Sequence, residues 1–258
     1  MRSEYSAICR ALALDSYRLF NAIIKGDVKI RSEFPEVGQL LAWYLCWRFD
    51  AEIIGVENIP VSGGTFLIGD HQQAFDGPLV IHGARSRGVN LVVKNDSESR
   101  KALTLLRLLT GAITINRNSS DFETMRTIVS ILKRGGAVCM FPEGHRSKDG
   151  KVRGFHPGAA VIARRAPKAK IVPFAITNAS HLTVGSVVKN LDRGIHRRKK
   201  PAIEFGPSFQ LPPARLPPKQ QREEDTRIMR GSVLDLLPED MAGEDVLYVV
   251  DHATARKH

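Results

Sequence analysis

From residue 52 onward, the chain alternates short apolar runs with segments whose apolar side chains recur at helical spacing. The apolar runs predict strands over residues 65–69, 91–93, 112–116, 137–141, 171–176 and 202–205. The segments between them predict helices over residues 78–87, 99–109, 120–132 and 157–165. Strands that are apolar throughout are typical of a parallel sheet buried on both faces. The pattern therefore predicts an α/β fold with a mostly parallel central sheet and helices on both faces.

Two amphipathic segments precede this region. Residues 5–24 carry apolar side chains at roughly helical spacing, and residues 36–50 form a second helical segment in which Trp43, Tyr44 and Trp47 cluster. Two interpretations are open: the helices pack on the main domain, or they anchor the protein at a membrane, because Trp, Tyr and flanking Arg favour the headgroup layer. No stretch reaches the ~20 apolar residues that span a bilayer, so we expect a surface contact only.

The composition changes again after the last predicted strand. Residues 207–218 are rich in proline, which predicts a stiff connector, and residues 219–237 follow as a polar helix. We therefore divide the chain into N-terminal helices (1–50), an α/β domain (51–206), and a connector with a C-terminal helix and tail (207–258).

The charge of the chain narrows its partners to anionic ones. Its 258 residues carry a formal net charge of +11, which attracts phosphates on nucleic acid, on an anionic bilayer or on a small substrate. Cys9, Cys46 and Cys139 are far apart in sequence, which argues against zinc pairs and a disulfide framework. A reducing, cytoplasmic setting is the simpler interpretation.

The segment GDHQQAFDGP, residues 69–78, follows a predicted strand directly and holds His71 and Asp76 five positions apart. Neither a regular strand nor a regular helix brings such positions together, but a turn does. A carboxylate bonded to one imidazole nitrogen leaves the other nitrogen free to act as a base. The alternative is that Asp76 caps the following helix and His71 is a polar loop residue.

Four further charged residues come just after predicted strands. Lys94 follows one strand, Arg117 leaves the next, and Glu143 and Arg146 lie in FPEGHRS, residues 141–147. The loops after parallel strands gather at the carboxyl edge of a sheet, where ligands bind. We therefore expect a base, its orienting acid and several cations that can bind phosphate to converge on one cleft.

Proline occurs within the apolar run IVPFAI, residues 171–176. Because Pro173 has no N–H to donate to a strand ladder, it predicts an edge strand or a strand end.

The H-x4-D segment, the G-x4-N-R segment, FPEG-x-R-S and the VP strand, in this order, resemble the glycerophospholipid acyltransferase family that acylates lysophosphatidic acid. The resemblance covers about residues 50–206, and GFHPGAAVIA (154–163) is similar to the family's segment between its third and fourth blocks. The N-terminal helix pair matches the family's membrane-docking element in position and character.

The resemblance implies that a fatty acyl group passes from acyl-CoA or acyl carrier protein to the free hydroxyl of the acceptor. His71 would be the general base, and Asp76 would orient it. No cofactor or metal is implied. We expect direct transfer without an acyl-enzyme, because there is no G-x-S-x-G segment and Cys139 lies within an apolar strand.

The resemblance also assigns the residues around the acceptor. Arg117 and Arg146 would contact its phosphate, with Lys94 as a third cation. Glu143 and Gly144 would position its glycerol end.

Four positions depart from the common family pattern. Asp70 stands in place of an asparagine, Gln73 of a serine, His145 of a threonine and His156 of a lysine. None of these changes removes a catalytic group. They leave open whether the acceptor is lysophosphatidic acid, glycerol 3-phosphate, another lysophospholipid or a lyso-aminolipid.

Basic residues gather in the run DRGIHRRKK (192–200) and, before it, at Arg164, Arg165, Lys168 and Lys170. We expect them to hold the protein against anionic lipid on the cytoplasmic side of a membrane. Docking of an acidic acyl carrier protein or of coenzyme A phosphates is the alternative.

Two other functional classes compete. A nucleic-acid-binding protein would explain the charge, but no recognised motif occurs and aromatics are not interleaved with the basic runs, so we expect no nucleic acid partner. A metal-dependent hydrolase would use His71, Asp76 and Glu143 as ligands.

Overall fold

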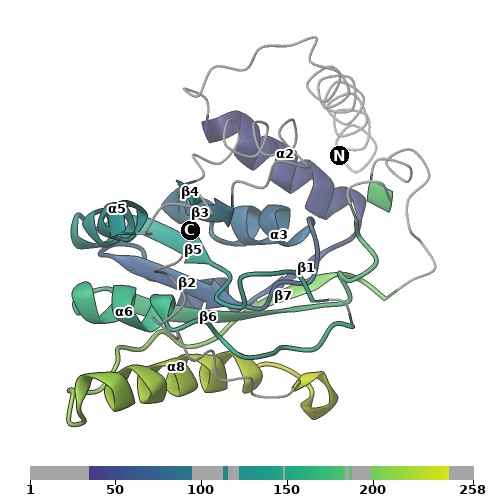
Figure 1. The fold of residues 1–258 in the computed structure, drawn as a ribbon. Coiled ribbons are helices and arrows are strands. Elements are labelled where there is room, and N and C mark those ends of the chain that lie inside the picture. Colours follow the sequence, from purple (N-terminus) through teal and green to yellow (C-terminus); the bar gives the residue numbers. More distant parts are fainter. Residues whose placement is uncertain are drawn as a thin grey trace, which may run out of the picture.

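A computed structural model describes residues 35–94, 113–115, 122–147, 149–183, 186–187 and 199–243 (Figure 1). Seven strands form one sheet in the order β1-β7-β6-β2-β5-β3-β4, in which every neighbouring pair is parallel except β6 with β7. The strands are β1 Glu52–Ile54, β2 Thr65–Gly69, β3 Asn90–Lys94, β4 Ile113–Ile115, β5 Ala137–Met140, β6 Lys170–Thr177 and β7 Ala202–Phe205.

Helices cover both faces of this sheet, with α2 and α3 on one side and α5, α6 and α8 on the other (Figure 1). The helices are α2 Pro35–Arg48, α3 Asp76–Gly83, α5 Phe122–Lys133, α6 Gly158–Arg165 and α8 Pro218–Leu234, with short 3-10 turns η1 Val56–Asn58, η2 Arg85–Arg87 and η4 Glu239–Met241. The predicted α/β fold with a mostly parallel sheet is confirmed. The predicted helices over 5–24 and 99–109 lie outside the described residues.

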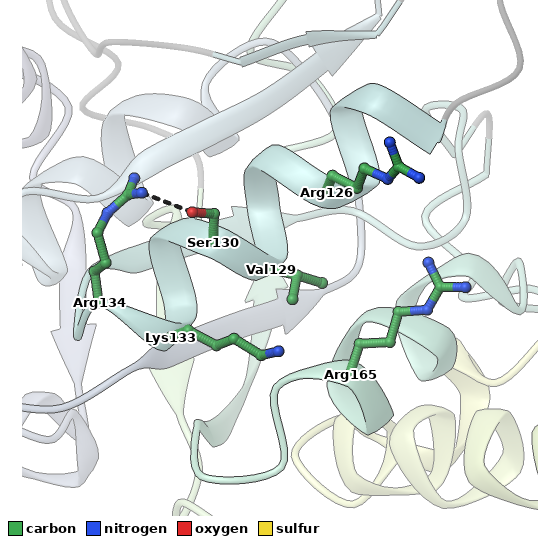
Figure 2. Close-up of a pocket in the computed structure, with 6 residues that line it drawn as sticks. All are labelled: Arg126, Val129, Ser130, Lys133, Arg134 and Arg165. Carbon is green, nitrogen blue, oxygen red and sulfur yellow. Dashed lines mark hydrogen bonds between the residues drawn. The ribbon is translucent and has the colours of Figure 1, made fainter.

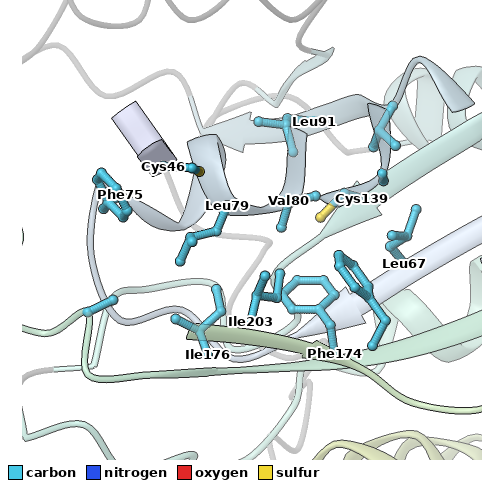
Figure 3. Close-up of a cluster of buried hydrophobic side chains, with 14 of the residues drawn as sticks. Cys46, Leu67, Phe75, Leu79, Val80, Leu91, Cys139, Phe174, Ile176 and Ile203 are labelled. Carbon is cyan, nitrogen blue, oxygen red and sulfur yellow. The ribbon is translucent and has the colours of Figure 1, made fainter. Parts of the chain in front are cut away.

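The alternation of side chains along β2 divides the core into two layers. All five residues of β2 are buried, and successive side chains point to opposite faces. Leu67 joins the cluster under α2 and α3, to which Phe174 and Leu79 also belong (Figure 3). Phe66 and Ile68 belong to the cluster under α5, α6 and α8. A strand buried on both faces therefore carries the loop that holds His71.

The expectation that Pro173 marks an edge or a strand end is wrong, because β6 pairs with β2 on one side and β7 on the other. The regular pairing with β7 ends at Phe174 and Phe205, and the chain then returns to β6 where Phe209 and Ile171 exchange two backbone hydrogen bonds. Between these points, Gly206 donates its N–H to the Pro173 carbonyl at 2.8 Å. The missing N–H of Pro173 falls opposite this irregular stretch, so no ladder bond is lost.

The C-terminal helix α8 packs into the second core layer through Met229 and Val233. A buried carboxylate fixes it further: Asp225, whose side chain is 1% exposed, accepts hydrogen bonds from Nε and Nη2 of Arg164, each at 2.6 Å. Arg164 was expected to face anionic lipid, but its guanidinium is engaged within the fold. The division into three segments at residues 50 and 206 stays a prediction.

Candidate active site

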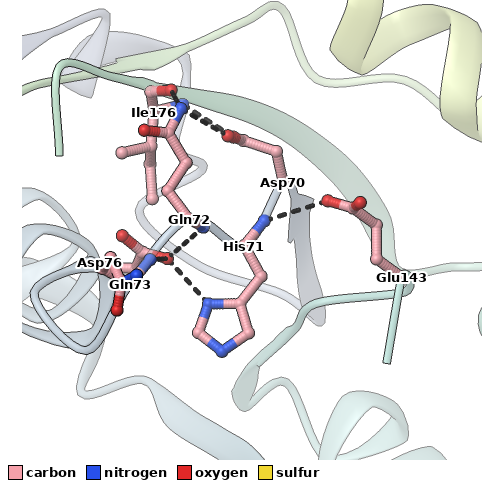
Figure 4. Close-up of polar contacts among 7 residues, drawn as sticks. All are labelled: Asp70, His71, Gln72, Gln73, Asp76, Glu143 and Ile176. Carbon is pink, nitrogen blue, oxygen red and sulfur yellow. Dashed lines mark hydrogen bonds and ion pairs between the residues drawn. The ribbon is translucent and has the colours of Figure 1, made fainter. Parts of the chain in front are cut away.

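The turn between β2 and α3 brings the predicted histidine and carboxylate together. His71 Nδ1 lies 2.7 Å from Asp76 Oδ2 (Figure 4). The turn begins at Gly69, where a Cβ atom would lie 2.2 Å from the ring of Phe174, so only glycine permits this approach. The contact lies at the carboxyl end of β2, the edge where parallel sheets bind ligands.

The carboxylate of Asp76 organises the whole turn. Its Oδ2 also accepts the backbone N–H groups of Gln72 at 2.7 Å and Gln73 at 2.9 Å. Asp76 therefore bonds to residues that precede the helix. The alternative interpretation, in which Asp76 caps α3, is wrong. Burial raises the pKa of Asp76, and the hydrogen bonds from His71, Gln73 and Gln72 oppose that rise. An ionised carboxylate can only accept hydrogen bonds, so Nδ1 of His71 donates to Asp76. In the neutral imidazole, Nε2 then carries the lone pair.

The loop after β5 holds the backbone and ring of His71. The backbone N–H of His71 donates to Glu143 Oε1 at 3.1 Å, and the His71 carbonyl accepts the N–H of Ser147 at 2.6 Å. The imidazole stacks on Phe141 with ring centroids 4.3 Å apart and planes inclined by 21°. The ring is thus held at Nδ1 and on one face, and because the side chain is 22% exposed it remains accessible to a substrate.

Glu143 lies beneath the histidine and is fully buried. One oxygen accepts the N–H of His71, and the other accepts the N–H of Arg153 at 3.2 Å. Burial raises the pKa of Glu143, and these backbone bonds counteract the rise. Gly144 follows with φ of +70°, a left-handed conformation that favours glycine. The two oxygens of Glu143 thus link the β2–α3 turn to the loop between β5 and α6. The predicted contact of Glu143 and Gly144 with an acceptor stays a prediction.

Two of the three predicted cations, Arg146 and Lys94, belong to chain segments at the same edge of the sheet. Arg146 is exposed and directly precedes Ser147, which is bonded to the His71 carbonyl. Lys94 is the last residue of β3, the strand beyond β5. Arg117 lies outside the described residues, two positions after the end of β4. The structure therefore brings Lys94, at the end of β3, and Arg146, in the loop after β5 that contacts His71, to the same edge.

Asp70 is a residue of the site to which sequence reasoning gave no role. It is buried, accepts the Ile176 N–H at 2.7 Å and accepts Gln72 Nε2 at 3.1 Å. The same Gln72 nitrogen donates to the Ile176 carbonyl, so the three residues connect the ends of β2 and β6. Burial, together with the charge of Asp76, raises the pKa of Asp70 well above its ordinary value. In the sequence, the one signal for this role was the position of Asp70 directly after a predicted buried strand.

Replacement of Asp70 by asparagine should make the protein's stability less dependent on pH. Because the folded pKa of Asp70 lies above the unfolded value of about 3.9, the folded state holds its proton longer, and wild-type stability falls as pH rises between the two values. The Asp70→Asn variant has no carboxyl group at this position, so it does not lose this stability as pH rises. Its melting temperature relative to wild type should therefore rise from pH 4 to pH 8.

Any cost of turning the Gln72 amide in this variant is independent of pH, so the pH dependence isolates the carboxyl group. Exposed Asp235, on the other side of the sheet, provides the control for loss of a carboxyl group, and the change with pH should be larger for Asp70→Asn. A pH-independent difference for Asp70→Asn would contradict the prediction.

Among the described residues, no group of three or more His, Cys, Asp or Glu side chains is placed to hold a metal ion. Within the same residues, no helix has the length and apolar character needed to cross a membrane.

A buried carboxylate that fixes an imidazole at the open edge of an α/β sheet is the arrangement of a site that activates a hydroxyl nucleophile. A model of the acyltransferase family matches residues 50–177, which include this site, and the chain belongs to that family.

The curated relatives carry one functional name. A 1-acyl-sn-glycerol-3-phosphate acyltransferase of Borreliella burgdorferi is 23% identical over 61% of this chain and 64% of its own length. A protein of the same name from Chlamydomonas reinhardtii is 26% identical over 76% of this chain and 55% of its own. The chain thus spans less than two thirds of the length of these relatives.

A solved structure shares the fold. The crystal structure of the 1-acyl-sn-glycerophosphate acyltransferase from Thermotoga maritima aligns with 92% of this chain and 99% of its own, with a TM-score of 0.55 and 20% identity.

Proposed function

We propose that this protein transfers a fatty acyl group from a thioester to the free hydroxyl of a lysophosphatidic acid-like acceptor in phospholipid synthesis. The observation that carries the proposal is the 2.7 Å contact between His71 Nδ1 and Asp76 Oδ2 at the carboxyl edge of the sheet. Family membership and the names of the relatives support the same reaction. The donor is acyl-CoA or acyl carrier protein, and the reaction uses no cofactor or metal.

In the proposed reaction, Nε2 of His71 removes the proton from the acceptor hydroxyl while that oxygen attacks the thioester carbonyl carbon. The tetrahedral intermediate then collapses, the C–S bond breaks, and the leaving thiolate takes the proton back from the imidazolium. Asp76 stabilises the positive charge on the ring between these steps. A positioned base contributes about 10²- to 10⁴-fold in rate, and orientation of two bound reactants supplies up to roughly 7–11 kcal/mol.

The acceptor's phosphate would be bound by Arg146, together with Lys94 and Arg117. The position of Arg146 in the loop that contacts His71 supports this role. A phosphate held there would present a nearby glycerol hydroxyl to the imidazole.

Replacement of Arg146 by glutamine should mainly raise KM for the phosphate-bearing acceptor. A hydrogen bond to a charged group contributes about 1.5–3 kcal/mol, and an exposed residue belongs at the lower end, so we expect a rise of about tenfold. Steady-state kinetics with lysophosphatidic acid and with monoacylglycerol, which lacks the phosphate, measure the effect. Arg85→Gln, an exposed arginine of η2, is the control. Equal losses with both acceptors would contradict a phosphate contact.

The membrane contact would be made by α2 with the segment that precedes it, on the cytoplasmic side of the bilayer. One side of α2 packs in the core through Tyr44, Leu45 and Cys46. Leu40 and Trp47 are 45% and 48% exposed on the same helix. Packing on the domain and contact with lipid are therefore compatible, because different residues of α2 would serve each.

The proposal is tested by offering the purified protein acyl-CoA and acyl carrier protein thioesters against a panel of lyso-acceptors. Transfer to lysophosphatidic acid is expected. Transfer only to a lyso-aminolipid or to glycerol 3-phosphate would revise the acceptor, and absence of transfer to every acceptor would refute the function.

A further inference from the structure

A second cationic site lies between α5 and α6. The groove there has a volume of about 310 Å³ and is lined by Arg126, Val129, Ser130, Lys133, Arg134 and Arg165 (Figure 2). Four of these six side chains are positively charged and none is acidic. The volume is at the lower end of the range for sites that bind small molecules.

The cations converge from two helices. Arg126 and Lys133 are seven residues apart on α5, about two turns, and so lie on one side of the helix. Arg165 ends α6 and faces them, with its Nη1 3.4 Å from the sulfur of Met125. Figure 2 shows the guanidinium groups of Arg126 and Arg165 on the same side of Val129, which is buried.

The fourth cation is held apart from the other three. Arg134 donates from Nη1 to Ser130 Oγ at 2.6 Å, and Figure 2 places it on the other side of α5 from Arg165. Arg126, Lys133 and Arg165 therefore define the part of the groove that can surround a ligand.

Among the described residues, no carboxylate forms an ion pair with these cations, whereas adjacent Arg164 is bound by Asp225. Grouped like charges repel one another, so this arrangement favours an anion in the groove. Guanidinium forks match the oxygens of phosphate and can bind two of them at once.

This groove is separate from the histidine site. Lys133 directly precedes the turn into β5, and Arg165 precedes β6, so both lie toward the amino ends of the strands. His71 follows the carboxyl end of β2. We propose that the α5–α6 groove binds a phosphate monoester dianion at a site distinct from the acyl-transfer centre.

The test compares a groove variant with a charge-matched control. Arg126→Gln/Arg165→Gln removes two charges from the groove, and Lys219→Gln/Arg227→Gln removes two exposed charges from α8. Calorimetric titration with inorganic phosphate, and sedimentation with phosphatidylcholine vesicles with and without phosphatidic acid, measure binding. Repeating both in an Arg146→Gln background separates this site from phosphate bound at the proposed acceptor site.

We expect the groove variant to lose at least tenfold in affinity for one of these probes, while the control and Arg146→Gln retain the groove's binding. Loss with inorganic phosphate identifies a soluble phosphate ligand, and loss with phosphatidic acid vesicles alone identifies a lipid headgroup. Equal binding by groove variant and control, or no binding of either probe by wild type, would overturn the proposal. Thermal melting checks the fold, and Arg126→Gln/Lys133→Gln repeats the test without altering the contact of Arg165 with Met125.

Discussion

His71→Ala should lower kcat for acyl transfer by about 10²- to 10⁴-fold, the contribution of a positioned general base. The variant removes the only group at the turn that presents an unprotonated ring nitrogen while a carboxylate holds the other. The fold should persist, because the ring is 22% exposed and its main packing contact is one stacked phenylalanine, Phe141. The measurement is steady-state turnover with saturating thioester and lysophosphatidic acid.

A matched variant guards against a general loss of structure. His82→Ala removes a half-buried histidine in the last turn of α3, six positions after Asp76, and it should retain turnover near the wild-type rate. Melting temperatures of both variants should lie close to wild type. Near-normal turnover by His71→Ala would refute the proposed mechanism.

Asp76→Asn should also lower kcat, by about 10²- to 10⁴-fold, without unfolding the protein. An amide can keep its oxygen at the Oδ2 position, where it still accepts the N–H groups of His71, Gln72 and Gln73. It lacks the negative charge that stabilises the imidazolium formed during transfer. The Oδ1 atom is buried and has no hydrogen-bond partner within the part of the chain that the structure describes, so the new NH₂ group would lack a partner there.

These effects separate in two measurements on the same variant. Because burial disfavours the carboxylate of Asp76, loss of its charge offsets the cost of the unsatisfied amide, and the melting temperature should change little while turnover collapses. Asp235→Asn, directly after α8, is the control for the substitution itself. A variant that melts far below wild type, with normal kcat in its folded fraction, would show that Asp76 is structural only.

Local patterns were sufficient to predict six of the seven strands, all but β1 (Glu52–Ile54), and the central contact of the site. Residues 65–69 form β2 as predicted, because a continuous apolar run can be satisfied only by burial on both faces. The turn after it was predicted from the impossibility of joining His71 and Asp76 on a regular element, and the observed 2.7 Å contact confirms it.

Partners distant in sequence could not be predicted in this way. Pro173 was expected at an edge because nothing in its own strand indicates that residues 206–208 break the pairing beside it. Arg164 and Arg165 form one basic pair in sequence, yet Asp225, 61 residues after Arg164, engages the first and not the second. Such distinctions depend on which helices meet on the sheet.

The carboxyl groups of the site illustrate the same limit. The contact of Glu143 with an acceptor stays a prediction, and the structure adds that its two oxygens accept the backbone N–H groups of His71 and Arg153. Asp70 was noted only as a departure from a family pattern, although its carboxyl bridges Ile176 and Gln72. The residue types in the sequence indicated a catalytic site. Only the structure shows which carboxyl groups are buried against His71 and hold it in position.

The most direct test follows an isotopically labelled acyl chain in the wild-type protein. Purified protein is incubated with lysophosphatidic acid and a thioester of coenzyme A or acyl carrier protein that carries the label, and lipids and thiol are quantified by mass spectrometry. The account predicts labelled phosphatidic acid and one released thiol for each molecule formed. Thiol release without labelled phosphatidic acid, or no reaction of either thioester, would contradict an imidazole that activates the acceptor hydroxyl.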